Sequence, residues 1–115
     1  MKRLTVLMLC LGCCASAHAL NYQFLRHSPA STFTDGDWEI AIATAREALD
    51  DAADGDSRAW TNPDTGHQGS YRVDAAPTGS PEGCRKLVIH HRTGQASATT
   101  EYVVCPQEDG WRFLR

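Results

Sequence analysis

Two strand-like segments face each other across a short, glycine-containing turn in the C-terminal part of the chain. Residues 84–92 (CRKLVIHHR) and 97–105 (SATTEYVVC) flank the turn 93–96 (TGQA). If the turn is centred on its two middle residues, Cys84 lies directly opposite Cys105. Opposed Cβ atoms of an antiparallel pair are ~4.5–5.5 Å apart, close to the separation that a disulfide needs. The sequence therefore predicts a hairpin closed by a Cys84–Cys105 disulfide.

The same alignment gathers apolar side chains on one face of the hairpin. Successive residues of a strand point to opposite faces, so Leu87 and Ile89 share a face with Tyr102 and Val104. A β-bulge would shift this register by one residue. The disulfide is expected to contribute roughly 3 kcal/mol in the chain-entropy model, a large share of the ~5–14 kcal/mol expected for so small a domain.

The N-terminus has the pattern of a cleavable secretory signal. Residues 1–19 begin with Lys and Arg, continue with the uncharged apolar run 4–14, and end in small residues at Ala17 and Ala19. This order is typical of a signal peptide and predicts a mature chain that starts at Leu20. The apolar run is shorter than the ~20 residues that a spanning helix requires, and we expect no transmembrane segment in the mature chain.

A second interpretation of this region is lipoprotein processing at Cys13, which follows Gly12. Lipidation signals normally have Leu three residues before the cysteine, and Cys10 stands at that position here. With cleavage after Ala19, the three cysteines among the first 19 residues are removed with the signal, and Cys84 and Cys105 remain. An even number of cysteines suits an oxidising compartment outside the cytoplasm.

Length and charge narrow the classes of protein further. Fewer than a hundred residues follow the signal, which is enough for one domain. The formal net charge of −3 becomes more negative once the two basic residues of the signal are removed. An acidic chain without a basic stripe repels phosphate backbones. We therefore expect no nucleic-acid partner.

One helix is predicted, over residues 35–54. Thr34 or Asp35 is suited to cap its start, and Gly55 to end it. Its apolar residues follow helical spacing: Trp38, Ile42, Ala45, Leu49 and Ala52. The preceding residues 20–33 show no period and are interpreted as a flexible leader, docked at most loosely through Tyr22 and Phe24.

Strand-like segments follow the helix. Residues 57–61 and 69–73 are separated by the turn 62–66 (NPDTG), in which Asn62 bonds its own backbone, Pro63 sets φ, and Gly66 permits a left-handed residue. After the Pro/Gly/Ser loop 75–83 and the hairpin, residues 111–115 form a last strand. The prediction is an α+β domain over residues 34–115: one N-terminal helix packed on an antiparallel meander sheet of about five strands, with one disulfide.

The motifs of these segments resemble those of a known family. In order, they are Trp60-Thr61-Asn62-Pro63-Asp64-Thr65-Gly66, Cys84-Arg85, and Cys105-Pro106 followed by Asp109-Gly110-Trp111. Together they resemble the C-terminal domain of bacterial 17 kDa surface antigens. The resemblance implies an outer-membrane or cell-surface setting in a Gram-negative bacterium and no established catalytic activity. Relatives often carry a lipidated cysteine and a glycine-zipper segment before the domain, and this chain has no such zipper.

The sequence contains only weak candidates for a metal-binding site. His90 and His91 are adjacent on a strand, so they point to opposite faces and do not chelate one ion together; we interpret them as solvated or edge residues. The acidic run 50–56 departs from a calcium loop at two ligand positions, and pairing with Arg58 or Arg72 explains its charge. We expect no metal and no cofactor.

The sequence also carries no catalytic motif of the common hydrolases or nucleotide-binding enzymes. We therefore predict an exported, non-enzymatic envelope or surface protein that acts as a structural or interaction module. A soluble periplasmic binding protein, or an inhibitor of a partner enzyme, is the alternative. A small hydrolase is the third hypothesis.

Overall fold

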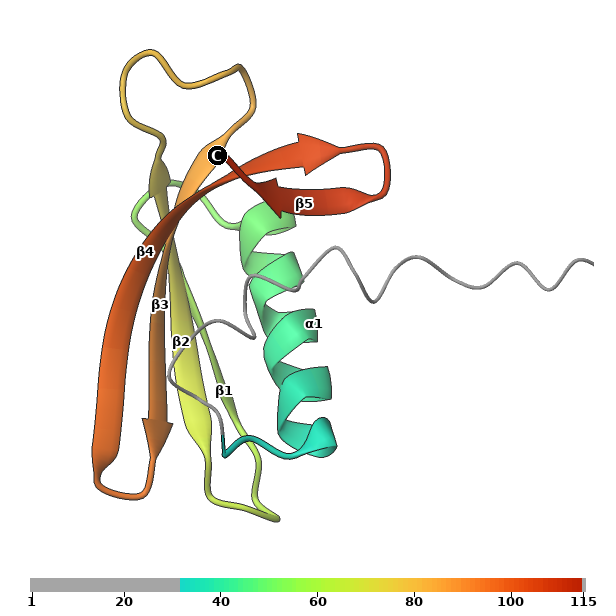
Figure 1. The fold of residues 1–115 in the computed structure, drawn as a ribbon, viewed down its shortest axis with the longest axis vertical. Helices are drawn as coiled ribbons and strands as arrows, with labels where there is room; N and C mark the ends of the chain where they lie inside the picture. Colours follow the sequence, from blue (N-terminus) through green and yellow to red (C-terminus); the bar gives the residue numbers. More distant parts are fainter. Residues whose placement is uncertain (1–31, 115) are drawn as a thin grey trace, which may run out of the picture.

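The computed structural model describes residues 32–114, which form one helix packed on one face of an antiparallel sheet (Figure 1). The predicted α+β fold class is confirmed. The elements run along the chain as α1 (Asp35–Asp51), β1 (Ser57–Thr61), β2 (Gln68–Ala75), β3 (Arg85–Thr93), β4 (Ala96–Gln107) and β5 (Gly110–Phe113). The sheet order β1-β2-β3-β4-β5 follows the chain, so every connection between two strands is a hairpin.

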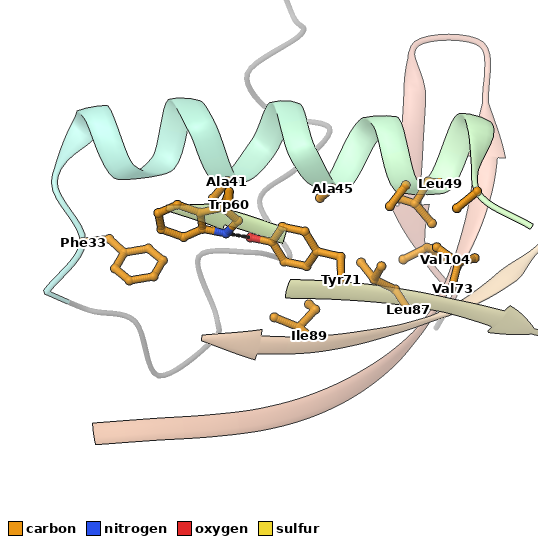
Figure 2. Close-up of a cluster of buried hydrophobic side chains, with 12 residues drawn as sticks. Phe33, Ala41, Ala45, Leu49, Trp60, Tyr71, Val73, Leu87, Ile89 and Val104 are labelled. Carbon is orange, nitrogen blue, oxygen red and sulfur yellow. Dashed lines mark hydrogen bonds between the residues drawn. The ribbon is translucent and has the colours of Figure 1, made fainter. Parts of the chain in front are cut away.

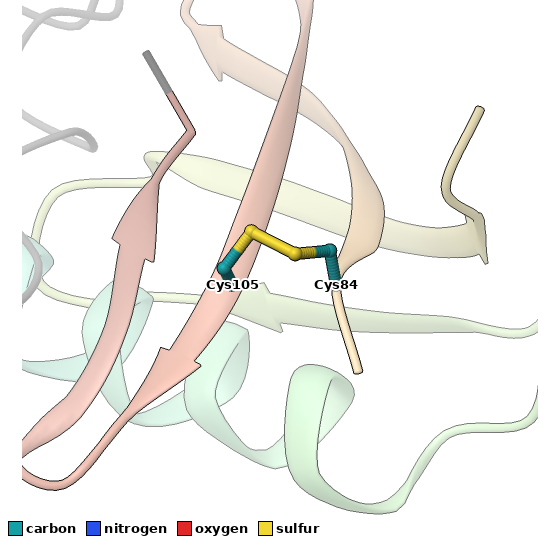
Figure 3. Close-up of a disulfide and its surroundings, with 2 residues drawn as sticks. All are labelled: Cys84 and Cys105. Carbon is teal, nitrogen blue, oxygen red and sulfur yellow. A yellow bond between two sulfur atoms is a disulfide. The ribbon is translucent and has the colours of Figure 1, made fainter. Parts of the chain in front are cut away.

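The β3–β4 hairpin has the predicted register. Thr93 lies opposite Ala96 and Arg85 opposite Val104, with no bulge between them. The next pair outward is Cys84 and Cys105, whose Cα atoms are 4.1 Å apart and whose sulfur atoms are bonded (Figure 3). The disulfide is therefore confirmed, and it joins the start of β3 to the far part of β4.

The helix begins as predicted but ends earlier. Thr34 is the N-cap, and the helix stops at Asp51, with Ala52 already extended. The cause is pairing further along the chain: the Gly55 N–H donates to the Val73 carbonyl at 2.7 Å, and the Asp56 carbonyl accepts from the Val73 N–H at 3.0 Å. The chain has to leave the helix before residue 54 to reach this edge of β2.

The buried face of α1 is rotated from the predicted stripe. Ala45, Leu49 and Ala52 are buried as predicted, but Trp38 and Ile42 are only half-buried. Their expected places are taken by the fully buried Asp37, Ala41 and Ala48. Alanines along the contact line leave space for the large side chains of the sheet, which fill the layer beneath the helix (Figure 2).

The core lies between α1 and the inner face of the sheet. Its largest members from the strands are Trp60, Tyr71, Val73, Leu87, Ile89 and Val104. Phe33, which we placed at the end of the flexible leader, is also a core residue with only 8% of its surface exposed. Phe33 therefore packs with the helix and the sheet. The rest of the predicted leader, including Tyr22 and Phe24, lies outside the described residues.

The C-terminal hairpin extends the sheet past the end of the helix (Figure 1). β5 pairs with the last residues of β4, from Val104 opposite Phe113 to Gln107 opposite Gly110. Trp111 and Phe113 share the inner face and pack against the core. The Trp111 indole donates to Asp50 at 2.9 Å, and the Phe113 ring lies 4.6 Å from that of Tyr102. The hairpin thus packs against the C-terminal end of α1.

Candidate functional site

The β1–β2 turn contains the most specific motif of the sequence. Asn62 Oδ1 accepts a hydrogen bond from the Asp64 N–H at 3.1 Å, and the Asn62 carbonyl accepts one from the Gly66 N–H at 2.7 Å. Gly66 has a φ of 74°, in the left-handed region that favours glycine. Pro63 is exposed, whereas the Asn62 side chain is buried. The buried amide shows that the turn packs against another element.

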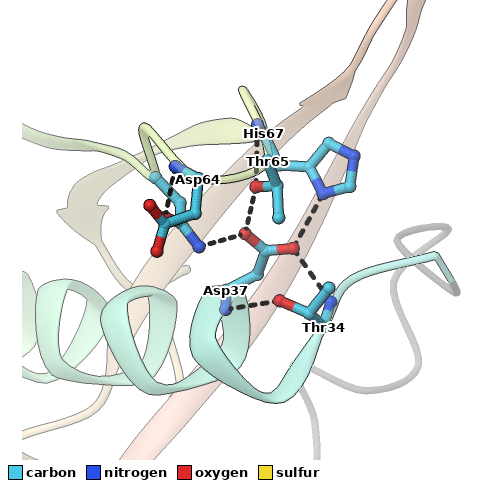
Figure 4. A network of polar contacts seen from close by, with 6 residues as sticks. Thr34, Asp37, Asp64, Thr65 and His67 are labelled. Atoms are coloured by element: carbon cyan, nitrogen blue, oxygen red, sulfur yellow. Dashed lines mark hydrogen bonds and ion pairs between the residues drawn. The ribbon is translucent and has the colours of Figure 1, made fainter.

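That element is the first turn of α1, where Asp37 accepts four hydrogen bonds (Figure 4). Asp37 Oδ1 accepts from Asn62 Nδ2 at 2.8 Å and from Thr65 Oγ1 at 2.6 Å. Asp37 Oδ2 accepts from the Thr34 N–H at 2.9 Å and contacts His67 Nδ1 at 2.7 Å. We call these residues the Asp37 network; it joins the start of the helix to the β1–β2 turn.

The network keeps Asp37 ionised in spite of complete burial. Burial raises the pKa of a carboxyl group, but the hydrogen bonds from Thr65, Thr34, His67 and Asn62 outweigh it and hold the pKa of Asp37 well below its usual range. The helix N-terminus adds favourable electrostatics for a negative charge. All four lone-pair positions of the carboxylate have protein partners, so this group has no position left for a substrate or metal ion.

The only sequence signal for a role of Asp37 is its spacing from Thr34, which is that of a capping box. The Asp37 N–H donates to Thr34 Oγ1 at 3.1 Å, which completes the box. The three partners from the β1–β2 turn had no such signal.

A second buried polar group lies beside this network on the inner face. Trp60, Gly69 and His91 stand opposite one another on β1, β2 and β3. Trp60 Nε1 donates to the Tyr71 hydroxyl at 3.2 Å, and that hydroxyl is 2.8 Å from His91 Nε2. Because an indole N–H only donates, the tyrosine oxygen accepts from it, and the hydroxyl hydrogen is available for the histidine nitrogen.

His91 is therefore a neutral core residue. Only 3% of its surface is exposed, and burial, with a smaller effect from His90, lowers its pKa from 6.5 to about 4. Burial also raises the pKa of Tyr71 above its usual value. The two histidines do point to opposite faces, but our interpretation of His91 as solvated or at an edge was wrong. Packing against Phe33 and Trp60 encloses its ring.

The low pKa of His91 predicts acid sensitivity. Between pH 6.5 and about 4 the unfolded chain binds a proton at His91 and the folded chain does not, so the free energy of unfolding falls as the pH falls. We expect a loss of about 2 kcal/mol across this window. Urea titrations of the wild type and of His91→Gln at pH 7, 5.5 and 4.5 measure it. If the free energy of unfolding depended on pH equally in the two proteins, the low pKa of His91 would be contradicted.

Gly69 makes the contact between these rings possible. A Cβ atom at Gly69 would lie 2.6 Å from Trp60 Nε1, 2.8 Å from His91 Cδ2 and 2.9 Å from the His90 carbonyl oxygen. Gly69→Ala is therefore expected to destabilise the fold by about 1–3 kcal/mol. Gly36→Ala is the matched control: its Cβ would meet nothing closer than 3.7 Å, and alanine favours a helix. Chemical denaturation of both variants compares them, and equal stabilities would contradict the steric explanation.

The acidic run after the helix does not pair as predicted. Asp54 contacts Arg85 at 2.8 Å, whereas Arg58 pairs with Glu47 and Arg72 with Asp74. Arg85 also donates to the Leu49 carbonyl at 3.0 Å, where its positive charge suits the C-terminal end of the helix. Within residues 32–114, no group of three or more His, Cys, Asp or Glu side chains is placed to hold a metal ion.

Two accessible surfaces stand out in the described part of the chain. The loop between β2 and β3 borders a shallow, open hollow, lined by residues including Pro77, Ser80 and Arg85. The larger surface is the outer face of the sheet, which carries no helix among the described residues (Figure 1). Its exposed polar and charged side chains come from β1 and from all three central strands: Thr61, Gln68, Arg72, Arg92, Ser97, Thr99 and Glu101.

Comparison with known proteins places this arrangement in a family. A family model described as 17 kDa outer membrane surface antigen matches residues 47–112, more than half of the chain. The chain belongs to this surface antigen family. No curated protein and no solved structure matches the chain.

The part of the chain that matches the surface antigen family runs from the second half of α1 to β5. It contains the turn residues Trp60, Asn62, Pro63 and Gly66 and both cysteines of the disulfide. The description of the family agrees with an envelope-associated protein. None of the helical residues that the structure describes forms a segment long and apolar enough to span a membrane.

The predicted processing sites of this surface antigen family member remain predictions. Ala17, Ala19 and Leu20, which define the expected cleavage site, lie outside the described residues, as does Cys13, the alternative lipidation site. The structure brings Trp60, Asn62 and Gly66 together in and beside the β1–β2 turn, and it places the disulfide at the other end of the sheet.

Proposed function

We propose that this surface antigen family member is an exported, non-enzymatic module of the cell envelope that acts by contacting other molecules. The observation that carries the proposal is the one-sided sheet: α1 covers the inner face, and a broad polar outer face remains open among the described residues. A surface with mixed charges and many hydroxyl groups suits specific polar contacts more than insertion into lipid.

Export is supported by the predicted signal in residues 1–19 and by the disulfide. A disulfide persists in the periplasm or at the cell surface and is rare in the reducing cytoplasm. The family description supports the outer membrane as the setting. Together these features favour a location in the periplasm or at the outer membrane of a Gram-negative cell.

The absence of enzymatic activity is supported by what the buried titratable groups do. Asp37 is saturated by four hydrogen bonds, and His91 and Tyr71 bond each other beneath Trp60. General acid–base catalysis needs a group that reaches a reacting atom. In the described residues these groups serve packing, and none of them lines the open hollow beside Arg85.

Fractionation tests the location. The full chain, tagged at its C-terminus and expressed in a Gram-negative host, is expected in the envelope fraction with a mature N-terminus at Leu20 by mass spectrometry. A start at Cys13 with acyl mass would show a lipid anchor instead. Retention in the cytoplasm with Met1 intact would contradict export. The second candidate function is a soluble binding protein or an inhibitor, and it is motivated by a cleavage site that leaves no lipid anchor. Recovery as free protein in a periplasmic extract would favour this candidate.

Photo-crosslinking tests the contact surface. A photoreactive amino acid at Arg72, exposed on the outer face, is expected to capture envelope components in cells. The matched control is Glu39, which is exposed on the helix on the other side of the molecule. Equal capture from the two positions, or capture from Glu39 alone, would contradict the outer face as the contact surface.

A further inference from the structure

The longest strand of the sheet has a neighbour on only one side over much of its length. β3 pairs with β4 from Ala96 to Val104, but β5 pairs only with residues 104–107. Residues 96–102 of β4 therefore form a sheet edge, with no described strand beyond it (Figure 1). An edge of this kind presents unpaired backbone groups that can accept another strand.

The hairpin geometry identifies these backbone groups. In an antiparallel pair, residues alternate between bonding the partner strand and pointing away from it. The Val103 carbonyl points away from β3, because it accepts a hydrogen bond from the Leu114 N–H at 2.9 Å on the β5 side. Backbone direction alternates along the strand, so residues that lie an even number of positions before Val103 also point away from β3. These residues are Glu101, Thr99 and Ser97, whose N–H and C=O groups point out of the edge.

The opposite edge of the sheet is protected. β1 is only five residues long, and the Arg58 guanidinium lies against its backbone, donating to the Ser57 carbonyl at 3.1 Å. Arg58 is held there by Glu47 at 3.3 Å. A charged side chain along an edge strand is a common protection against unwanted pairing. The edge of β4 has no comparable cover among residues 32–114.

We propose that two copies of this chain pair through the edges of β4, antiparallel and about a two-fold axis at Thr99. This register places Thr99 opposite Thr99 of the second copy, and Ser97 opposite Glu101 of the second copy. It uses only the outward-pointing residues and leaves the bond between Leu114 and Val103 in place. The result is one continuous sheet of two five-stranded halves.

The side chains of this register are complementary. Arg92 stands beside Ser97 on the outer face, with His90 beside Thr99. Glu101 of the second copy would thus meet the short Ser97 side chain, with the Arg92 guanidinium one strand further in, within reach of a long carboxylate side chain. Like charges do not face each other directly, and Thr–Thr pairs are favourable across strands. A two-fold contact also closes on itself, without forming fibres.

Disulfide trapping tests the register. Residues of a hydrogen-bonded antiparallel pair have Cα atoms ~5.5 Å apart, which a disulfide spans. Thr99→Cys in the full exported chain is expected to give a dimer on non-reducing gels, and mass spectrometry should find a peptide pair joined through position 99 of both copies. Ala59→Cys, exposed at the β1 edge, is the matched control. No dimer with Thr99→Cys, or equal trapping with Ala59→Cys, would overturn the proposal.

A charge exchange tests the same contact without new cysteines. Glu101→Arg is expected to weaken the dimer about tenfold in sedimentation equilibrium, because it places positive charges near Arg92 of the other copy. Adding Arg92→Glu restores opposite charges and is expected to recover wild-type association. A wild type that stays monomeric at all concentrations, or that pairs only with a different protein, would overturn the proposal. Neither result depends on where the protein resides, so a failure here leaves the proposed location untouched.

Discussion

Asp37→Ala is expected to lower the free energy of unfolding by about 3–5 kcal/mol, the largest effect of any single substitution considered. The variant leaves three donors without their acceptor: the buried Asn62 amide, and the Thr65 hydroxyl and Thr34 N–H, whose bonds to Asp37 are partly buried. Each buried donor left without a partner costs about 1–3 kcal/mol. Urea denaturation followed by tryptophan fluorescence measures the loss, since Trp60 packs next to this region.

Asp35→Ala is the control for this experiment. Asp35 lies in the same helical turn but is exposed, so its removal takes away only a favourable charge near the helix N-terminus, worth about 0.3–1 kcal/mol. Asp37→Asn keeps one oxygen acceptor and should fall between the two. If Asp37→Ala were no more destabilising than Asp35→Ala, the Asp37 network would not hold the turn to the helix.

Loss of the disulfide is expected to have the second largest effect, roughly 3 kcal/mol. Cys84 and Cys105 are separated by 21 positions, and the bond between them restricts the unfolded chain over this segment. Domains of this size are stable by only about 5–15 kcal/mol, so reduction should lower the urea midpoint clearly. The paired variant Cys84→Ala with Cys105→Ala should match the reduced wild type and should not respond to reductant. Identical oxidised and reduced midpoints in the wild type would contradict this expectation.

The parts of the fold that depend on neighbouring residues were predictable from the sequence. The register of the β3–β4 hairpin follows from a two-residue turn between alternating strands, and it sets Cys84 opposite Cys105. The Thr34 cap follows from a polar residue placed just before a helical pattern. In each case the interaction that determines the structure lies within a few residues or across one turn.

The parts that were missed depend on contacts between distant segments. Asp37 meets Asn62, Thr65 and His67 only because the β1–β2 turn folds back onto the helix, 25 to 30 positions along the chain. His91 is buried because Gly69, on the neighbouring strand, has no side chain. No local pattern carries this information. The same applies to the early end of α1, which follows from the pairing of Gly55 and Asp56 with β2.

The Asp37 network and the disulfide lie at opposite ends of the sheet and stabilise different stretches of the chain. The network joins residues 34–67, the N-terminal half of the domain, without any covalent bond, whereas the disulfide joins β3 to β4 in the C-terminal half. Reduction therefore removes the link between β3 and β4 and leaves the hydrogen bonds between α1 and the β1–β2 turn in place. The redox state of the surroundings thus acts directly on only one of the two links that lie outside the shared hydrophobic core.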